Sequence, residues 1–368
     1  MDMEYAKIEG WADYKGKPYV IAGPCSAESE EQVLDTARQL AASGRVSSFR
    51  AGIWKPRTRP GGFQGLGAVA LPWLAAMERE TGLAAITEVA RPEHIELALK
   101  AGLRQFWIGA RTTVNPFIVQ ELADALKGSG CRVWVKNPVS QDLGLWIGAI
   151  ERFAAVGITE LGAIHRGFSQ YEKGLYRNPP EWQIAIALKS QCPTLPLLCD
   201  PSHITGDAAL VPYVAQAAMD LDYDGLIIET HPNPPAALSD AAQQITPAAL
   251  EDLLYNLEYR RKGAPTESGL ETLHALRAEI DSLDTQWIET LATRFEKVNT
   301  LGLLKKEEHM LVLQMDRWRQ ILKTRLASAR HHGLDERFIT KLLELVHAES
   351  IRRQDLIVNV RTGAAANA

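Results

Sequence analysis

The stretch "YVIAGPCSAES" at residues 19–29 shows the unit from which the first part of the chain is built. An apolar run stops at Gly23 and Pro24, which interrupt regular structure, and small polar and acidic residues follow. Runs of this kind, bounded by turn residues, are typical of buried strands in a parallel sheet. Cys25 stands at the carboxyl end of this predicted strand. A lone cysteine is most often a small buried hydrophobe, so its role depends on what the other strand ends carry.

Seven more such runs follow before about residue 260, separated by amphipathic stretches such as "EEQVLDTARQLAAS". With the first run, they cover residues 18–24, 47–53, 83–89, 105–110, 132–138, 158–167, 194–203 and 224–231. Strands that alternate with helices indicate βα units, and eight units in about 250 residues predict an α/β fold of the (β/α)8 TIM barrel type. A doubly wound open sheet is the alternative, but no glycine-rich dinucleotide fingerprint follows the first run.

All eight runs carry ionisable side chains at or just after their carboxyl ends. They are Cys25, Arg50, Lys55, Glu88, Arg111, Lys136, His165, Arg166, Asp200, His203, Glu229 and His231. The active site of a TIM barrel lies at the carboxyl ends of its strands, so we expect these groups to meet. A thiolate, an imidazole and two carboxylates, from Cys25, His203, Glu229 and Asp240, would suit Mn²⁺, Fe²⁺, Zn²⁺ or Cu²⁺.

The same strand ends carry six cations, although the net charge of the chain is −5. They are Arg50, Lys55, Arg57, Arg111, Lys136 and Arg166. Such a cluster would repel itself unless carboxylates or an anionic ligand joined it, and arginine forks bind carboxylate and phosphate bidentately. For one residue an ion pair is an adequate explanation, but six together predict an anionic substrate.

The composition limits the remaining possibilities. With 23% charged residues and a net charge of −5, the chain is not expected to bind nucleic acid or a membrane surface. No apolar run reaches the roughly 20 residues that cross a bilayer, and "MDMEYAKIEGWADYKGK" lacks an apolar signal-peptide core. The four cysteines have irregular spacings and form no disulfide framework. We therefore expect a reduced, cytoplasmic protein.

The pattern changes at "YRRKGAPTESG" (residues 259–269), which contains glycine and proline and predicts a linker over 263–269 between domains of residues 1–262 and 270–368. Apolar residues then recur every three or four positions, which predicts a long amphipathic helix. They are Leu276, Ile280, Leu283, Trp287, Leu291, Phe295 and Val298. Two more helices are expected near 306–331 and 335–360, separated by "HHGLDERF", where Gly333 ends one helix and Asp335 caps the next.

Arg277 and Arg294 lie roughly 25 Å apart along this helix, at about 1.5 Å per residue, and differ by about 100° in direction. They cannot contact one small ligand in the same chain. Either they serve different sites or a second chain supplies one of them, and a solvated charged face is the plainer reading. A helix this long also calls for a partner, so we expect a dimer formed through this region.

The motifs "GPCSAES", "KPRTRP", "ITEV", "IGAR", "VKNP", "HRG", "DPSH" and "IIETHPNP…LSD" fall in order at successive strand ends over residues 15–260. In this series the chain resembles type I 3-deoxy-D-arabino-heptulosonate 7-phosphate (DAHP) synthases. The resemblance implies a divalent-metal enzyme, with Mn²⁺ as the expected ion, that condenses phosphoenolpyruvate with erythrose 4-phosphate in aromatic amino-acid biosynthesis. A sister family that makes an octulosonate phosphate has an asparagine-containing motif where "KPRT" stands here.

The resemblance also implies roles for individual residues. The implied metal ligands are Cys25, His203, Glu229 and Asp240. The implied substrate contacts are Arg50, Lys55, Pro56, Arg57, Thr58, Glu88, Gly109, Ala110, Arg111, Lys136, His165 and Arg166. Lys55 could assist proton transfer to the developing alkoxide, as could a metal-bound water. Arg59, after "KPRT", departs from the small residue usual in the family.

The last part of the chain, through "LRAEIDSLDTQWIETLATR", "LLKKEE", "MDRW" and "AESIRRQ", resembles the all-helical chorismate mutases over residues 268–360. The resemblance implies an intertwined homodimer of three-helix chains that converts chorismate to prephenate. The implied catalytic residues are Arg277 (reaching the partner's site), Arg294, Lys305, Arg317, Ser350 and Gln354. Trp318 and Gln314 replace acids that are common in the family. A non-catalytic dimerisation and ligand-sensing tail is therefore the alternative, and in either case prephenate or chorismate is the expected effector of the barrel.

Overall fold

The computed structural model describes residues 18–56, 61–171, 174–260, 263 and 266–359. By its internal contacts the chain divides into two units after Arg260. Each unit is described below by itself.

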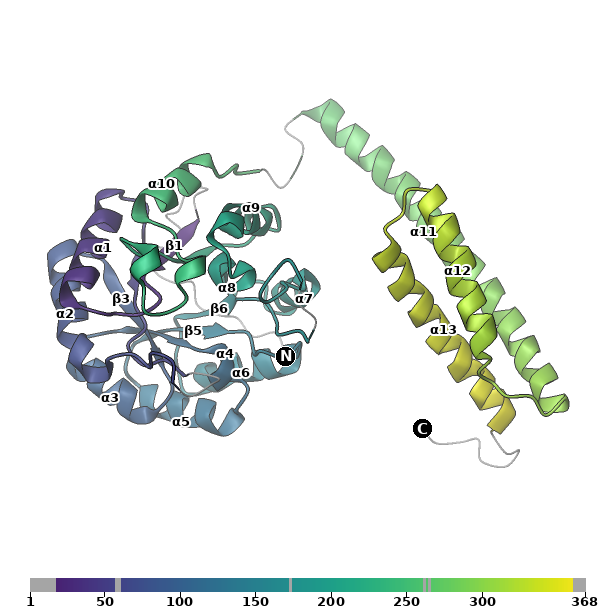
Figure 1. The fold of residues 1–368 in the computed structure, drawn as a ribbon, viewed down its shortest axis with the longest axis horizontal. Helices are drawn as coiled ribbons and strands as arrows, with labels where there is room; N and C mark the ends of the chain where they lie inside the picture. Colours follow the sequence, from purple (N-terminus) through teal and green to yellow (C-terminus); the bar gives the residue numbers. More distant parts are fainter. Residues whose placement is uncertain (1–17, 57–60, 172–173, 261–262, 264–265, 360–368) are drawn as a thin grey trace. The chain divides into compact units, whose positions relative to one another are not determined.

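Eight parallel strands form a closed barrel in the first unit (Figure 1). The strands are β1 Tyr19–Gly23, β2 Ser48–Arg50, β3 Ala84–Val89, β4 Gln105–Ile108, β5 Arg132–Lys136, β6 Leu161–His165, β7 Leu197–Cys199 and β8 Gly225–Glu229. Each strand pairs with the next in the sequence, and β8 pairs with β1 to close the ring. The predicted TIM barrel is confirmed, and the open sheet is excluded.

Ten α-helices connect the strands or follow them, and in Figure 1 they surround the barrel among the described residues. They are α1 Glu30–Ala42, α2 Leu71–Thr81, α3 Pro92–Lys100, α4 Ala110–Thr113, α5 Pro116–Leu126, α6 Leu143–Ala155, α7 Trp182–Gln191, α8 Pro201–Thr205, α9 Val211–Asp220 and α10 Pro247–Asn256. Local sequence explains their starts: the side chain of Ser29 accepts from the Gln32 backbone N–H at α1, and Asp142 accepts from Leu145 at α6.

The barrel has two apolar layers. One lies between strands and helices, and the other fills the barrel itself. The inner layer consists of Tyr19, Ile21, Ile86, Trp107, Trp134, Ile164, Leu198 and Ile227. A Cβ on Gly162 would lie 2.2 Å from the ring of Trp134, so glycine is needed there to admit the indole. Because side chains fill the interior, a ligand site has to lie at an end of the barrel.

One predicted strand is wrong in its last part. The run 194–203 forms a strand only over Leu197–Cys199, and α8 begins at Pro201. Proline fits the first turn of a helix, and the Asp200 side chain accepts from the backbone N–H of His203 to cap it. His203 therefore lies on a short helix rather than at a strand end.

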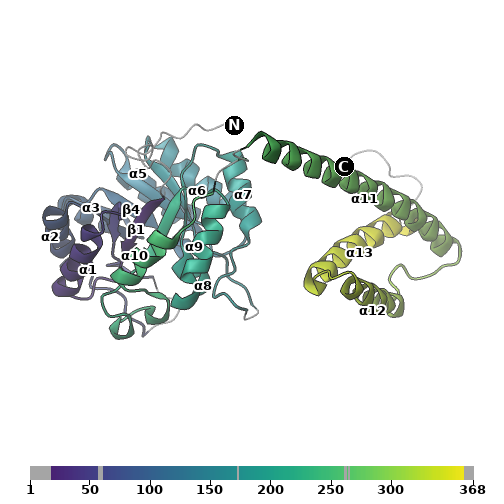
Figure 2. The same ribbon diagram turned by 90° about the horizontal axis from the view of Figure 1, so that it is seen from above.

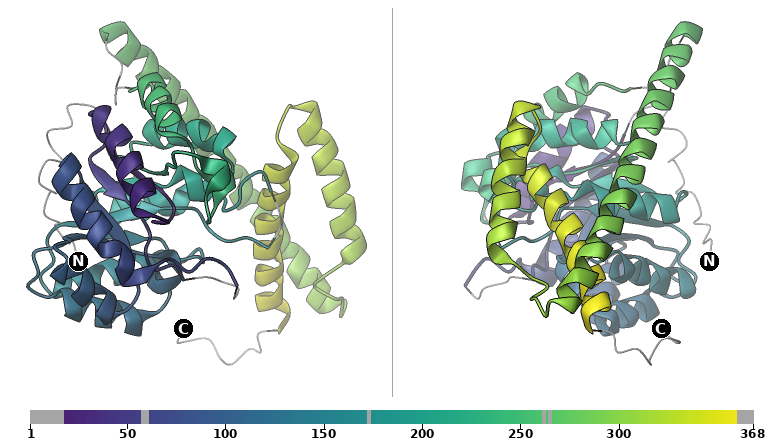
Figure 3. Two further views of the ribbon diagram at one scale, coloured as in Figure 1. Left: turned by 60° about the vertical axis from the view of Figure 1, so that its left-hand side comes forward. Right: turned by 90° about the vertical axis from the view of Figure 1, so that its right-hand side faces the viewer.

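The second unit contains three helices, α11 Glu267–Glu307, α12 Met315–His331 and α13 Glu336–Asn359. α13 packs against both α11 and α12, and Figures 2 and 3 show α13 beside the C-terminal part of α11, with α12 farther from α11 than α13 is. The predicted turn is confirmed: Gly333 has φ 69°, and Asp335 Oδ1 accepts from the Phe338 backbone N–H at 2.7 Å.

Two predicted boundaries in this unit need correction. α11 already begins at Glu267, inside the predicted linker, because the Thr266 side chain accepts from the Gly269 backbone N–H and caps it. α11 also continues to Glu307, and α12 begins only at Met315, so the helix expected over 306–331 is two elements with a loop between them. No helix among the described residues is long and apolar enough to cross a membrane.

Candidate active sites

Gly23 determines how the first strand delivers Cys25. Its φ is +146°, and a Cβ would lie 2.1 Å from the carbonyl oxygen of Arg50. Only glycine therefore lets the end of β1 approach the end of β2 so closely. Cys25 follows two residues later and is fully buried.

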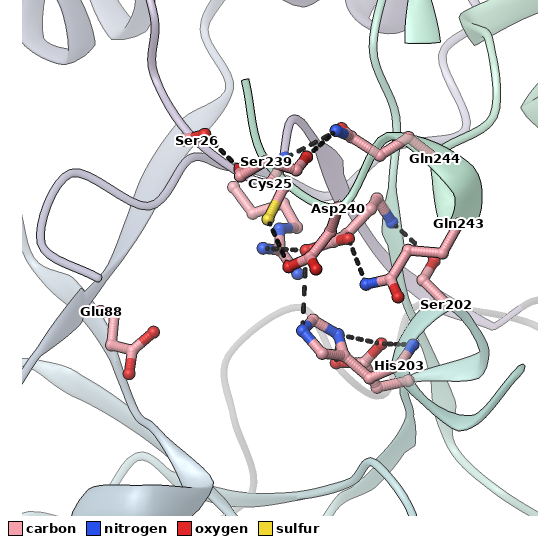
Figure 4. Close-up of polar contacts among 12 residues, drawn as sticks. Cys25, Ser26, Glu88, Ser202, His203, Ser239, Asp240, Gln243 and Gln244 are labelled. Atoms are coloured by element: carbon pink, nitrogen blue, oxygen red, sulfur yellow. Dashed lines mark hydrogen bonds and ion pairs between the residues drawn. The ribbon is translucent and has the colours of Figure 1, made fainter. Parts of the chain in front are cut away.

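The four predicted metal ligands meet at this end of the barrel, and Figure 4 shows three of them, Cys25, His203 and Asp240. Ligand atoms of Cys25, Glu229 and Asp240 all lie within 4.8 Å of one another. The Cys25 thiol donates to Asp240 Oδ2 at 3.3 Å, and His203 Nε2 lies 3.7 Å from Glu229 Oε1. Sulfur, nitrogen and carboxylate donors together fit a borderline divalent cation. Burial raises the pKa of the Cys25 thiol to about 12, so a thiolate ligand would need a cation beside it.

Neighbouring side chains hold these ligands in place. Gln243 Nε2 donates to Glu229 Oε2 at 2.7 Å, and Gln244 Oε1 accepts from the Cys25 backbone N–H at 3.0 Å. Arg177 pairs with Asp240 at 3.0 Å. None of these three supporting residues is predicted from the sequence. Gln243 and Gln244 had a sequence signal, since they lie three and four residues after the predicted ligand Asp240, whereas Arg177 lies in a long loop without such a signal.

Asp200 links the metal-ligand cluster to a cation. Its carboxylate accepts from Lys136 Nζ at 2.8 Å and lies 2.9 Å from His203 Nδ1. Burial by itself would raise the pKa of Asp200, but the adjacent His203 and Lys136 hold that pKa well below its usual range. An Asp200 anion therefore orients the His203 ring with Nε2 directed at Glu229.

The predicted cations gather at the same end of the barrel. Arg50, 1% exposed, pairs with Glu229 at 3.0 Å, and its Nε and Nη1 atoms have no hydrogen-bond partner among the described residues. Lys55 Nζ donates to the Cys25 carbonyl oxygen and lies 2.9 Å from Cys25 Sγ. Arg166 is buried, and burial lowers its pKa to about 10, with the charges of Arg111 and Arg177 acting in the same direction. Cationic groups clustered in this way can bind an anionic ligand.

His165 was expected among the substrate contacts, but the structure does not bring it to this cluster. Ile164 belongs to the layer inside the barrel, so its neighbour His165 points outward, as side chains alternate along a strand. Its ring lies among Trp146, Phe168, Trp182 and Tyr223. Nε2 contacts the Pro180 carbonyl oxygen at 2.6 Å, and Nδ1 contacts the Tyr223 hydroxyl at 2.8 Å. Burial lowers the pKa of His165 to about 4, which agrees with a neutral, structural imidazole.

The other predicted substrate contacts have more varied places. Figure 4 shows Glu88 apart from the metal-ligand cluster. Its Oε1 would lie 2.0 Å from a Cβ on Gly109, so glycine there makes room for the carboxylate. Ala110 is buried in α4, and Pro56 is half-buried. Arg57 and Thr58 lie outside the described residues.

The helical unit brings four of its predicted residues together. Arg294 Nη1 donates to Ser350 Oγ at 2.8 Å, and Gln354 Nε2 donates to the Ser350 carbonyl oxygen at 3.1 Å. Lys305 Nζ donates to the Val312 carbonyl oxygen at 2.6 Å. Gln354 is buried, and its Oε1 has no hydrogen-bond partner among the described residues.

The remaining two predicted residues do not join this group within one chain. Arg277 is exposed on the first half of α11. Arg317 is exposed on α12, where its Nη1 donates to Gln320 Oε1 at 2.6 Å.

His347 lies beside this group and is not predicted from the sequence. Its ring stacks on Trp318 with centroids 4.1 Å apart. Burial and the charges of Arg294 and Lys305 lower the pKa of His347. Those charges show that His347 lies close to the predicted catalytic group, one turn before Ser350 on α13.

A closed parallel barrel that gathers a thiol, carboxylates, an imidazole and buried cations at one end defines a barrel enzyme for an anionic substrate. The chain belongs to the DAHP synthetase I family, whose model matches residues 9–262. Residues 276–355 match the family model of chorismate mutase type II. Both resemblances are confirmed, and together they support a bifunctional shikimate-pathway enzyme that is a synthase and a mutase.

Known proteins agree with the match to the barrel. Phospho-2-dehydro-3-deoxyheptonate aldolase of Thermotoga maritima is 31% identical over 65% of this chain and 68% of its own length. The crystal structure of that DAHP synthase superposes with a TM-score of 0.62, at 28% identity, over 69% of this chain and 72% of the other. 2-Dehydro-3-deoxyphosphooctonate aldolase of Nitratidesulfovibrio vulgaris is 27% identical over 66% of this chain and 93% of its own length.

Proposed function

We propose that the barrel condenses phosphoenolpyruvate with erythrose 4-phosphate to DAHP and inorganic phosphate, with Mn²⁺ held by Cys25, His203, Glu229 and Asp240. The observation that carries this proposal is the joint position of those four ligands beside Arg50 and Lys55. The choice of the four-carbon sugar is supported by "KPRT" and by the higher identity to a heptonate enzyme than to an octonate enzyme. We expect this chemistry to take place in the cytoplasm, without a nucleic-acid or membrane partner.

The residues divide the reaction between them. C3 of phosphoenolpyruvate forms a bond to the aldehyde carbon, and the aldehyde oxygen takes up a proton. Lys55 is placed to supply this proton, because its ammonium lies against Cys25 Sγ. Water then adds at C2 and the bond from C2 to the phosphate oxygen breaks, which releases phosphate. Arg50, Lys136 and Arg166 hold the anionic groups during these steps. A bound divalent cation would polarise the aldehyde.

The test of this function uses two cysteine variants. Cys25→Ala should abolish phosphate release from phosphoenolpyruvate in the presence of erythrose 4-phosphate and Mn²⁺, and should also abolish Mn²⁺ binding in equilibrium dialysis. Cys192→Ala is the matched control, because Cys192 is also buried but packs among apolar residues of the outer layer. Full activity of Cys25→Ala after metal removal by a chelator would contradict the proposed ligand set.

For the helical unit we propose a homodimer that converts chorismate to prephenate. The apolar stripe on α11 supports the dimer: Leu276 is 53% exposed and Leu283 62% exposed, whereas Val298, on the same stripe, is buried against the rest of the unit. Such a stripe needs a cover, and a second copy would also bring its Arg277 to the group around Arg294 and Gln354. Arg277 and Arg294 would bind the two carboxylates of chorismate. Lys305 and Gln354 would donate hydrogen bonds to its ether oxygen as negative charge develops there.

Mixing inactive chains tests this arrangement. Arg277→Ala and Gln354→Ala should each inactivate the mutase, but co-refolded mixtures should regain activity, because a mixed dimer has one site with every residue intact. A mixture of Arg294→Ala with Gln354→Ala is the control and should stay inactive, since both changes fall within the same chain's half of the site. Activity of Arg277→Ala alone would show that this arginine has no catalytic part.

We further propose that prephenate bound to the helical unit changes the rate of the barrel, since the two enzymes act in one pathway and share one chain. The measurement is the synthase rate of the full chain with and without prephenate, for wild type and for Arg294→Ala. Prephenate should change the wild-type rate and leave the rate of the Arg294→Ala variant unchanged. Equal wild-type rates would rule the proposal out.

A further inference from the structure

One indole ring lies under two of the cations of the barrel. Trp107 is on β4, 1% exposed, within the layer that fills the barrel. The Cζ atom of Arg50 lies over its ring at 4.9 Å from the centroid, and Lys136 Nζ lies at 5.6 Å. Attraction between a cation and an aromatic face is strongest where water is excluded, as it is here.

The edge of the same ring contacts a carboxyl group. Trp107 Nε1 donates to Glu88 Oε2 at 3.2 Å, and the two residues are direct partners in the pairing of β3 with β4. A single side chain thus contacts Arg50, Lys136 and Glu88, which come from three different strands.

The ring differs from the other partners of these cations because it carries no charge. Arg50 pairs with Glu229, and Lys136 pairs with Asp200. More carboxylates would compete with an anionic substrate for the same donors, whereas an aromatic face attracts the cations and leaves their N–H groups available. Arg50 keeps two such groups, Nε and Nη1, without a partner among the described residues.

We propose that Trp107 is a positioning residue for phosphoenolpyruvate: its face holds Arg50 and Lys136 in the arrangement that receives the substrate's anionic groups. This inference rests on the proposed synthase function. It goes beyond that function because it makes the affinity for phosphoenolpyruvate depend on an uncharged side chain that packs against the cations. If Trp107 only filled the barrel, its replacement would lower stability without acting on one substrate selectively.

The test measures kinetics with each substrate varied in turn. Trp107→Leu, which removes the aromatic face, should raise KM for phosphoenolpyruvate roughly tenfold, or about 1.4 kcal/mol. Trp107→Phe keeps a smaller face and should raise it about threefold. In both variants kcat and KM for erythrose 4-phosphate should stay within about twofold. Trp134→Phe is the matched control, because Trp134 belongs to the same inner layer and should leave KM for phosphoenolpyruvate unchanged.

A double-mutant cycle with Lys136→Met then tests whether the ring acts through the cation. The effects of Trp107→Leu and Lys136→Met on KM for phosphoenolpyruvate should be less than additive. Equal losses for both substrates, or the same pattern in Trp134→Phe, would show a structural role and overturn the inference. If Trp107→Leu does not fold, Trp107→Phe decides the matter by the same comparison.

The two proposals fail in different ways. If Lys136→Met raises KM for phosphoenolpyruvate and the Trp107 variants do not, the inference about Trp107 is wrong and the proposed synthase site stands. If Lys136→Met also leaves that KM unchanged, the assignment of the cation cluster to this substrate fails, and the inference fails with it.

Discussion

The two candidate sites both use arginine and lysine, but they balance those charges differently. In the barrel, Arg50 and Lys136 each pair with a carboxylate of the same chain. In the helical unit, Arg294 donates to the Ser350 hydroxyl and Lys305 donates to the Val312 carbonyl, both of which are neutral. Burial lowers the pKa of both helical cations. Carboxylates of the same chain thus balance these two barrel cations, whereas the two helical cations contact only neutral groups here and, we propose, meet an anionic ligand and a second chain.

Breaking the dimer should separate the two activities most strongly. Leu283→Glu would put a charge on the exposed stripe of α11, where a charge costs nothing in the monomer but opposes burial against a second copy. Mutase activity should fall more than about 100-fold while the synthase rate changes less than about twofold. Sedimentation of the full chain should show a shift toward the monomer.

The control for this change is Tyr213→Glu, at an exposed apolar residue of α9 in the barrel unit. It should leave both mutase activity and the sedimentation coefficient as in wild type. Full mutase activity in a monomeric Leu283→Glu variant would mean that each helical unit holds a complete site.

The barrel site should depend next on Asp200. Asp200→Asn removes the anion between Lys136 and His203, so the His203 ring loses its orientation and Lys136 loses its partner. Metal affinity should fall roughly 10- to 100-fold, as for other residues that orient a ligand. Isothermal titration with Mn²⁺ measures this loss, with Asp207→Asn, at the exposed turn after α8, as the matched control. Unchanged Mn²⁺ affinity would show that Asp200 pairs with Lys136 but does not orient the metal ligand His203.

Acid should destabilise the barrel through His165. Its pKa in the folded state is lowered to about 4, below the value of about 6.5 in an unfolded chain, so the unfolded state binds more protons between these values. The stability is fully present above about pH 6.5 and decreases as the pH falls toward 4, by roughly 3 kcal/mol in all. His165→Gln should be less stable at pH 7 and should lose less stability on acidification.

Urea unfolding of the barrel, followed by tryptophan fluorescence at several pH values, measures this dependence. His274→Gln, at an exposed position of α11, is the control and should keep the wild-type slope. An unchanged slope in His165→Gln would assign the acid sensitivity to other buried groups.

Sequence predicted the barrel and most of its site because parallel strands direct their carboxyl ends to one edge. Cys25, Glu229 and Lys136 could be placed from that rule alone. His165 could not, because the end of a strand says nothing about the side to which a residue points. Alternation along β6 from Ile164 would have supplied that information. Trp107 could not be predicted for a different reason. An aromatic residue inside a strand is usually a core residue, and only the structure shows which cations lie over its ring.

In the helical unit, spacing predicted the helices but not how they pack. The stacking of Trp318 on His347 depends on the approach of α12 to α13, which no local pattern specifies. The helix starts were also misplaced, since α11 begins at a threonine cap inside an apparent linker. The expectation that a second chain contributes to the site rested only on the length of the helix and on the distance along it between Arg277 and Arg294.

The smallest effect is expected from substitutions at Trp318. These substitutions test whether the helical unit is a mutase or a ligand-sensing tail. Trp318→Glu would replace the ring that stacks on His347 with a carboxylate close to Arg294 and Lys305. If the stacked pair merely substitutes for an acid that contacts the substrate hydroxyl, the variant should raise kcat/KM for chorismate about three- to tenfold, the net effect of one typical hydrogen bond of about 1 kcal/mol. Trp318→Gln is the matched control, because it removes the ring without adding charge.

A wild-type chain that binds prephenate but does not turn over chorismate, together with no gain in Trp318→Glu, would leave the helical unit as a sensor. A gain in Trp318→Glu and none in Trp318→Gln would show instead that the site is catalytic and that Trp318 limits its rate.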